Sequence, residues 1–335
     1  MFVFHLSKTK GQTMNPNFKD FLLKTTQAIA CKETEVIQSL WSGYGKIARI
    51  KLEGAEYDTV VVKHISLTQA SAHPRGWNTN NSHNRKVKSY QVETCWYENW
   101  NQLSTGFCRV PKFLGSFSQD QDQWIVLEDL DTQFPERKQQ LTLPQVKVCL
   151  HWLAHFHAAF LNKKPEGLWE IGTYWHLATR PDELEQMQDS DLKNKAKALD
   201  ETLNNCHYKT LVHGDAKVAN FCFSSNGEKV AALDFQYVGG GCGMKDVAYF
   251  LSSCLSGEDC EQYETELLNY YFDQLEIGCA DKLTRPQYKE LEQEWRYLYP
   301  VAYTDFTRFL LGWMPTHPKI NNYSLNLMKL VLEKL

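Results

Sequence analysis

The sequence predicts an α+β fold with two lobes, a small β-rich N-terminal lobe and a larger, mainly helical C-terminal lobe. Segments rich in β-branched residues are concentrated in about the first third of the chain. The remainder carries long segments whose apolar residues recur every three to four positions, as in amphipathic helices. With 335 residues, the chain is long enough for two lobes around a sizeable buried core.

The N-terminal lobe is expected to span residues 14–128. A helix is expected over Asn17–Ala30. The following segment, Ile37–Leu52, contains strand-like stretches with glycines between them that suit turns. The β-branched run Asp58–Ile65 predicts a strand, and Trp124–Leu127 predicts a second strand at the end of this lobe.

A long loop and a helix are expected between these two strands. Residues 66–84 are rich in Ser, Asn, His, Gly and Pro, which marks a loop, and loops of this length tend to be functional. Residues 85–103 carry apolar side chains at helical spacing. Ahead of the lobe, residues 1–13 are expected to form an accessory leader.

The C-terminal lobe, residues 129–335, is expected to be mainly helical. Thr142 and Pro144 predict the start of a long helix, because Thr is a frequent N-cap and Pro fits the first helical turn. Another helix is expected toward Leu335. Four more helices are expected in the segments 181–204, 244–256, 260–276 and 285–298.

The composition argues against several classes of protein. A formal net charge of -4 gives no basic excess of the kind that nucleic-acid binding requires. No apolar run approaches the length of a membrane helix. The ten cysteines are scattered and form no Cys-x-x-Cys pair, which favours reduced thiols in a cytoplasmic protein. We therefore expect neither a nucleic-acid partner nor a membrane, and the sequence carries no indication of an oligomeric state.

The segment Leu211–Phe223 contains the residues with the clearest chemistry. Asp215 and Asn220 lie five residues apart on one expected loop, and Asp234 ends an apolar run fourteen residues further on. Transfer of a γ-phosphoryl group requires metal ions against the phosphates, positive charge, and a base for the attacking hydroxyl. Asn220 and Asp234 offer the oxygen ligands that Mg²⁺ prefers, Asp215 suits the base, and Lys217 suits the charge on the γ-phosphate.

The pattern His213-Gly214-Asp215, with Asn220 and Asp234, resembles the catalytic signature of the aminoglycoside phosphotransferase and choline kinase-like superfamily. Taken with Glu128-Asp129-Leu130, it is similar to the ecdysteroid kinase-like subgroup over roughly residues 40–260. The resemblance implies a protein-kinase-like two-lobe fold. It also implies an enzyme that uses ATP and Mg²⁺ to phosphorylate a hydroxyl of a small-molecule acceptor.

The resemblance further implies a nucleotide site in the N-terminal lobe. Lys63 ends a strand, as the phosphate-contacting lysine of kinase-like folds does, and Glu93 is implied to be its ion-pair partner. Gly43 and Gly45 suit a shortened phosphate-covering turn, although a plain hairpin turn explains them equally well. Two further positions, Glu128 and Leu130, are implied to bind the adenine edge through backbone groups of the hinge.

Two features outside the segment Leu211–Phe223 also predict roles for their residues. Asp246 stands at an expected helix start, where a carboxylate caps free amides, and the resemblance implies a structural role in support of the active-site loop. An aromatic-dense stretch between Trp295 and Trp313 belongs either to the core or to a surface that stacks on a planar or cationic substrate. Asp305, within this stretch, is a candidate partner for a substrate amine.

Two alternative functions compete with the small-molecule kinase. The first is a non-catalytic nucleotide-binding regulatory protein, but usable residues occupy all six candidate catalytic positions, namely Lys63, Glu93, Asp215, Lys217, Asn220 and Asp234. The second is a protein kinase, whose catalytic loop has the same Asp215-x-Lys217-x-x-Asn220 spacing. Gly214 in place of arginine and Gln236 in place of glycine argue against this second alternative.

Overall fold

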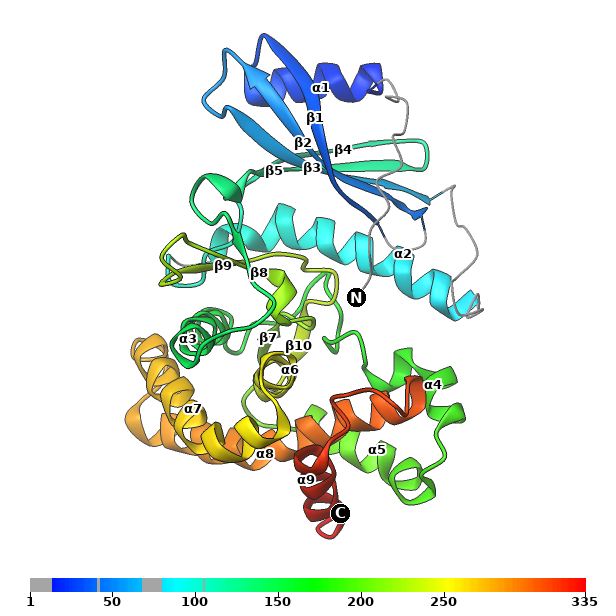
Figure 1. Cartoon of the computed structure of the whole chain (residues 1–335), viewed down its shortest axis with the longest axis vertical. Coiled ribbons are helices and arrows are strands. Elements are labelled where there is room, and N and C mark those ends of the chain that lie inside the picture. The colour runs from blue at the N-terminus through cyan, green and yellow to red at the C-terminus, as the bar shows by residue number, and fades with distance from the viewer. Residues whose placement is uncertain (1–13, 41–42, 68–79, 105) are drawn as a thin grey trace. The chain divides into compact units, whose positions relative to one another are not determined.

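A computed structural model of the chain describes residues 14–40, 43–67, 80–104 and 106–335 (Figure 1). The expected leader and residues 68–79 of the expected long loop lie outside the described residues. The chain divides into two compact units, of which the first comprises Met1–Gly76 and Phe113–Asp129 and the second comprises Trp77–Lys112 and Leu130–Leu335. The predicted boundary between the lobes at residues 128 and 129 stays a prediction. By their contacts, residues Trp77–Lys112 belong to the second unit.

The first unit is built on a five-stranded antiparallel sheet with the order β1-β2-β3-β5-β4. The predicted strands 58–65 and 124–127 are confirmed as β3 and β5, which pair with each other in the middle of the sheet. The strands are β1 (Ala30–Ser39), β2 (Gly45–Glu53), β3 (Thr59–Ser66), β4 (Phe113–Gln119) and β5 (Asp122–Glu128).

Helix α1 (Pro16–Thr26) packs on one face of this sheet (Figure 1). The Asn15 side chain caps the helix by accepting a hydrogen bond from the backbone N–H of Phe18 at 3.1 Å. Phe18 and Leu22 lie one turn apart and are buried against apolar residues of three strands. The helix is shorter than predicted, because Gln27 ends it in the left-handed conformation and Ala30 already begins β1.

The second unit is mainly helical, with short strands near its candidate catalytic loops (Figure 1). The predicted start of the long helix is confirmed, since Thr142 and Gln145 form a capping box ahead of α3. Its helices are α2 (Asn80–Cys95), α3 (Leu143–Ala159), α4 (Pro181–Gln186), α5 (Ser190–Asn204), α6 (Met244–Cys254), α7 (Gly257–Gly278), α8 (Arg285–Trp313) and α9 (Asn322–Leu332). Its strands are β6 (Glu136–Arg137), β7 (Thr210–Val212), β8 (Phe221–Phe223), β9 (Val230–Ala232) and β10 (Gly239–Gly241), and they pair as β6-β8-β9 and β10-β7.

Helix α8 is much longer than the predicted segment 285–298, because it continues through Pro300. A proline inside a helix costs about 3 kcal/mol. Burial of a large apolar side chain contributes about 1.5–3 kcal/mol, and the second half of α8 buries Tyr303, Phe306 and Phe309. The packing of these aromatic side chains therefore outweighs the break at Pro300.

Two further predicted helices are also less regular than expected. The α-helical part of segment 85–103 ends at Cys95, and a π-helical turn, Trp96–Trp100, follows it. Segment 181–204 forms two helices, α4 and α5, because the chain is extended at Met187 and Asp189 caps a new helix by accepting a hydrogen bond from Leu192.

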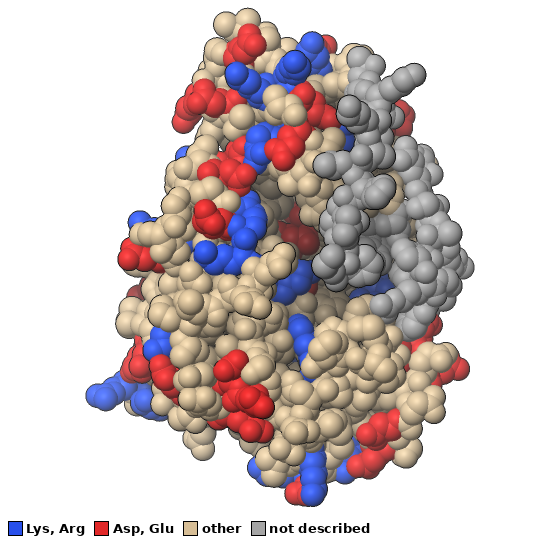
Figure 2. Space-filling model, viewed as in Figure 1, with Lys and Arg blue, Asp and Glu red and all other residues tan. Residues whose placement is uncertain are grey.

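The described residues include no helix that is both long and apolar enough to cross a membrane. On the face that Figure 2 shows, lysine and arginine side chains are interspersed with aspartate and glutamate side chains. This pattern agrees with the small net charge of -4.

Candidate active site

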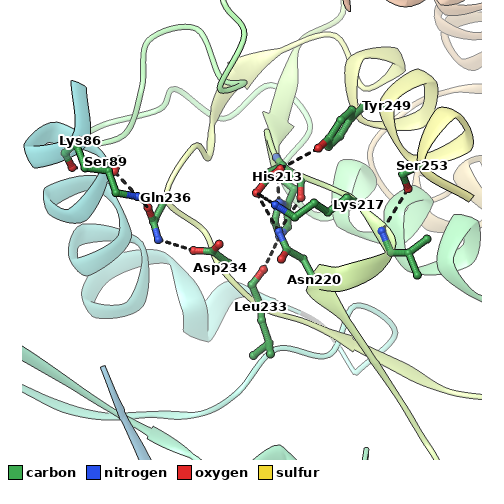
Figure 3. A network of polar contacts seen from close by, with 12 residues as sticks. Lys86, Ser89, His213, Lys217, Asn220, Leu233, Asp234, Gln236, Tyr249 and Ser253 are labelled. Atoms are coloured by element: carbon green, nitrogen blue, oxygen red, sulfur yellow. Dashed lines mark hydrogen bonds and ion pairs between the residues drawn. The ribbon is translucent and has the colours of Figure 1, made fainter. Parts of the chain in front are cut away.

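Strands β8 and β9 bring two of the predicted residues next to each other in the second unit. Phe221 of β8 lies opposite Ala232 of β9 in an antiparallel pair. The backbone N–H of Leu233 donates to the carbonyl of Asn220 at 2.9 Å. Asn220 immediately precedes β8 and Asp234 follows β9, so the two side chains lie close together in Figure 3.

Asp215 is a buried carboxylate with three side-chain hydrogen-bond donors. Its Oδ2 accepts from Lys217 Nζ at 2.8 Å and from Asn220 Nδ2 at 3.1 Å, and its Oδ1 accepts from Tyr249 Oη at 3.1 Å. The Asn220 amide also donates to the Asp215 carbonyl at 2.8 Å. These contacts hold the carboxylate in one orientation, as a positioned base requires.

Lys217 remains partly exposed although it pairs with Asp215. Its side chain is 39% exposed, whereas that of Asp215 is 7% exposed. Burial lowers the pKa of Lys217, but the charge of Asp215 and its hydrogen bond outweigh burial, so the pKa is raised above its ordinary value. Lys217 therefore presents a positive charge beside the candidate base.

Asp246 supports the loop that contains Asp215 by accepting hydrogen bonds from its backbone. It is fully buried near the start of α6 and accepts the backbone N–H groups of His213 at 2.5 Å and Gly214 at 2.9 Å. It also accepts from His157 Nε2 at 3.1 Å. The structural role expected for Asp246 is confirmed, although its carboxylate caps the 213–214 loop rather than the free amides of its own helix.

His213 is buried and supports the same loop. Its Nε2 bonds the carbonyl of Leu233 at 2.9 Å, and its Nδ1 accepts from the backbone N–H of Asp215 at 3.3 Å. The ring thus joins the Asp215 loop to the segment that precedes Asp234 (Figure 3). With both ring nitrogens engaged by backbone groups, His213 positions the loop.

Gly214 has a left-handed backbone and no room for a Cβ, and Gly214→Ala is expected to destabilise the fold. Its φ is +78°, and an added Cβ would lie 2.1 Å from the carbonyl oxygen of Tyr237. The left-handed backbone alone costs about 1–2 kcal/mol, and the collision with backbone adds to this cost. Urea denaturation should show the loss. Gly106→Ala is the control, since nothing lies within 4 Å of its added Cβ; equal stability of the two variants would contradict the prediction.

Asp234 is connected to helix α2 through a side chain whose role the sequence did not indicate. Gln236 Nε2 donates to Asp234 Oδ1 at 2.6 Å, and Gln236 Oε1 accepts from Lys86 Nζ at 2.8 Å and from Ser89 Oγ at 3.3 Å (Figure 3). Asp234 itself has a φ of +69°, a strained conformation for a residue other than glycine. Such strain is typical of functional sites.

The predicted residue Glu93 lies on α2 near the same segment. It is buried, and the next helical turn carries Trp96, whose ring stacks on Phe235 at a centroid distance of 4.5 Å. Burial raises the pKa of Tyr97 well above its ordinary value, and the charges of Glu93 and Asp234 raise it further. Glu93 and Asp234 therefore both lie within electrostatic reach of Tyr97.

The remaining predicted residues lie in the first unit, apart from Leu130, which is the first residue of the chain segment that returns to the second unit. Lys63 is buried on β3, between Ile47 of β2 and Ile125 of β5 in the register of the sheet. Glu128 ends β5, and Leu130 begins a short 3₁₀ turn at the point where the second unit starts. The nucleotide-binding roles of these residues stay predictions.

Gly43 lies in the connection between β1 and β2, and Gly45 is the first residue of β2. Gly43 has a φ of +76° and Gly45 a φ of +133°, and a Cβ at Gly45 would lie 2.0 Å from the His64 carbonyl oxygen. Close packing of the β2 start against β3 is therefore enough to require glycine at position 45. The phosphate-covering role stays a prediction beside this structural requirement.

The predicted Mg²⁺ ligands provide hard oxygen donors. The amide nitrogen of Asn220 is engaged by Asp215, which leaves the carboxamide oxygen as its donor to a cation. Asp234 adds a carboxylate from the neighbouring strand end. One carboxylate, one amide oxygen and phosphate oxygens form a donor set that suits Mg²⁺, which usually takes few ligands from protein.

The aromatic stretch of α8 contributes to a buried cluster, which we call the aromatic cluster. It contains Trp175, Tyr249, Phe306, Phe309 and Leu310, with Tyr174, Trp313 and Ile320 packed against it. Asp305 is not available to a substrate amine as expected, because it is buried and accepts from Arg308 Nε at 2.8 Å. Asp305 lies in the interior because α8 extends beyond Pro300 and packs its second half into the core.

Residues 166–284, which include the Asp215 loop and Asp234, match the Ecdysteroid kinase-like family. The match confirms the resemblance noted above over about a third of the chain. No curated protein matches the chain.

The chain is also similar to solved structures of small-molecule kinases. A microcompartment-associated aminopropanol kinase is 14% identical, with a TM-score of 0.50 over 94% of each chain. An aminoglycoside-3'-phosphotransferase of type VIII is 17% identical, with a TM-score of 0.44 over 83% of this chain and 98% of that one. A Plasmodium vivax ethanolamine kinase is 11% identical, with a TM-score of 0.48 over 90% and 81%. The likeness to the aminopropanol kinase confirms the kinase-like α+β fold.

Proposed function

We propose that this protein, whose residues 166–284 match the Ecdysteroid kinase-like family, is an ATP-dependent O-phosphotransferase that acts on a hydroxyl of a small molecule. The observation that carries the proposal is the Asp215 carboxylate, which Lys217, Asn220 and Tyr249 hold in one orientation beside Asp234. A base, a cation and metal ligands gathered in this way are the parts that phosphoryl transfer requires.

In the proposed reaction, the acceptor oxygen forms a bond to the γ-phosphorus while the bond from phosphorus to the bridging oxygen of ADP breaks. Asp215 aligns the acceptor hydroxyl and takes its proton late in the transfer. Tyr249 and Asn220 keep the carboxylate oriented toward the hydroxyl. Lys217, which is partly exposed beside Asp215, moves to the negative charge that spreads over the γ-phosphate oxygens.

The nucleotide-binding roles are assigned residue by residue, as the resemblance to kinase-like folds implies. Lys63 contacts the α- and β-phosphates, and Glu93 supports it, as in kinase-like folds. The β1–β2 turn with Gly43 and Gly45 covers the phosphates, and backbone groups at Glu128 and Leu130 bind the adenine edge. Asn220 and Asp234 would hold Mg²⁺, which would supply positive charge to the phosphates.

The acceptor class rests on the family and the fold. The aminopropanol kinase, which is similar over most of the chain, is named for a small hydroxyl compound.

All ten cysteines are free thiols in the structure, which supports a cytoplasmic location.

The proposal is tested by incubating the protein with γ-labelled ATP, Mg²⁺ and a pooled metabolite extract. We expect label in at least one small molecule with the wild-type protein and none with Asp215→Asn. Binding of ATP without label in any small molecule would instead support the regulatory alternative. Label in protein at the expense of small molecules would support a protein kinase.

A further inference from the structure

Lys319 lies above the aromatic cluster on the connection between α8 and α9. Its ammonium nitrogen is 4.7 Å from the ring centroid of Tyr249 and 5.3 Å from that of Phe306. Both distances place the cation over ring faces, where the aromatic quadrupole attracts it. The side chain is half-buried, so it remains in contact with solvent.

One side chain separates Lys319 from the candidate catalytic base. The ring of Tyr249 lies under Lys319, and its hydroxyl donates to Asp215 Oδ1 at 3.1 Å. Lys319 and Asp215 therefore contact the same side chain, Tyr249, one at its ring and the other at its hydroxyl. The position of Lys319 suits recognition of the part of the acceptor that does not react.

Lys319 differs from two arginines near this cluster in having no ion-paired carboxylate among the described residues. Its ammonium makes no hydrogen bond or ion pair with any residue that the structure describes. Arg180 lies over Tyr174 and Phe309, but it pairs with Glu183 at 2.8 Å. Arg308, likewise, is neutralised by Asp305.

The electrostatics of Lys319 favour the arrival of an anion. Burial lowers its pKa to about 8, and the charge of Asp215 offsets this effect only in part. Burial removes part of the hydration that stabilises the charged ammonium. An anionic group bound to the ammonium would replace this lost stabilisation. The carboxylate of Asp305 does not supply this interaction, because it is engaged by Arg308 in the interior.

We propose that Lys319 binds an anionic group of the acceptor, so that the acceptor is a hydroxyl compound that also carries a carboxylate or similar anion. The proposal rests on the proposed function and deepens it by naming the acceptor class. The shared chemistry, an anionic oxygen at Lys319, would also suit the γ-phosphate of ATP, and the experiment separates these two sources.

The test compares three probes that share a benzene ring and a hydroxyethyl group: 4-(2-hydroxyethyl)benzoate, 2-(4-methylphenyl)ethanol and 4-(2-hydroxyethyl)benzylamine. Their dissociation constants are measured by ligand-observed NMR with the full chain, Mg²⁺ and a non-hydrolysable ATP analogue. We expect the benzoate to bind about tenfold more tightly than the neutral probe, the effect of one charge-assisted contact. Lys319→Met should abolish this preference and Lys319→Arg should retain it.

Lys329→Met on α9 is the matched control, because it removes an exposed lysine far along the same C-terminal segment. Equal binding of the three probes, tighter binding of the amine, or no binding of any probe would overturn the proposal. A tenfold loss of affinity for the ATP analogue in Lys319→Met, with the probe preference unchanged, would assign Lys319 to the nucleotide and overturn it as well. Because binding is measured apart from transfer, label transfer to the extract decides the proposed function separately.

The pH dependence of benzoate binding gives a second prediction. Lys319 carries its charge below about pH 8 and loses it above, so the affinity of the wild-type protein should fall between pH 7 and pH 9. The groups that face Lys319 are Asp215, Lys217, Cys254 and Tyr249, besides His317 on its own segment. Burial raises the pKa values of the Cys254 thiol and the Tyr249 hydroxyl, so both stay neutral in this range. An equally steep fall in Lys319→Met would contradict the prediction.

Discussion

Asp215→Asn is expected to lower kcat for phosphoryl transfer by about 10²–10⁴, the usual cost of losing a positioned base. Asparagine has the same shape as aspartate, so Tyr249 still has an acceptor at Oδ1. The amide nitrogen, however, meets Lys217 Nζ and Asn220 Nδ2, which are donors themselves. The variant therefore has neither the base nor the ion pair that holds Lys217.

The measurement is a rate of label transfer at saturating ATP, together with the dissociation constant of the nucleotide. Nucleotide affinity should change by less than about threefold, since the base acts on the acceptor side. Asp191→Asn is the control, because Asp191 is an exposed carboxylate whose nearest lysine lies 3.9 Å away. A turnover within a few-fold of the wild type in Asp215→Asn would exclude the proposed base.

Asp246→Ala is expected to lower the free energy of unfolding by about 3–5 kcal/mol, which is typical of breaking a buried charged network. The carboxylate accepts from three buried donors, the backbone N–H groups of His213 and Gly214 and the Nε2 of His157. Alanine leaves these donors unsatisfied, and each unsatisfied buried group costs about 1–3 kcal/mol.

The loss is measured by urea denaturation, with Asp273→Ala as the control on an exposed position of α7. Asp246→Asn should be intermediate, since it keeps one acceptor oxygen and remains measurable if the alanine variant does not fold. A change below about 1 kcal/mol in Asp246→Ala would be smaller than the cost of even one unsatisfied buried donor. Such a result would show that the loop holds itself without the carboxylate.

The sequence predicted those contacts of the site that join residues close together in the chain. Asp215, Lys217 and Asn220 lie within one short loop, so their mutual contacts follow from residue spacing. Asp234 joins them because β8 and β9 are consecutive antiparallel strands. The same is true of the fold, since α3 and β3 follow from a capping box and a β-branched run.

The contacts that the sequence did not reveal join residues far apart in the chain. Tyr249 is thirty-four residues from Asp215, and Lys86 is one hundred and fifty residues from Gln236. Tyr249 follows Asp246 by one helical turn, so the two share a face of α6, and this spacing is the one signal that the sequence offered. Nothing in the sequence pointed to a role for Lys319, because the position of this residue depends on where α8 ends.

The packing around Phe235 bears on how such an enzyme would be controlled. In protein kinases, the phenylalanine after the metal-binding aspartate switches between two positions. Here Phe235 is fully buried, stacked on Trp96 and 4.6 Å from the His213 ring, while Gln236 is held by Lys86. A segment fixed on both sides leaves no on-off conformational gate at this position. Under the proposed function, the rate of phosphoryl transfer would then follow the amount of the protein and the concentrations of nucleotide and acceptor.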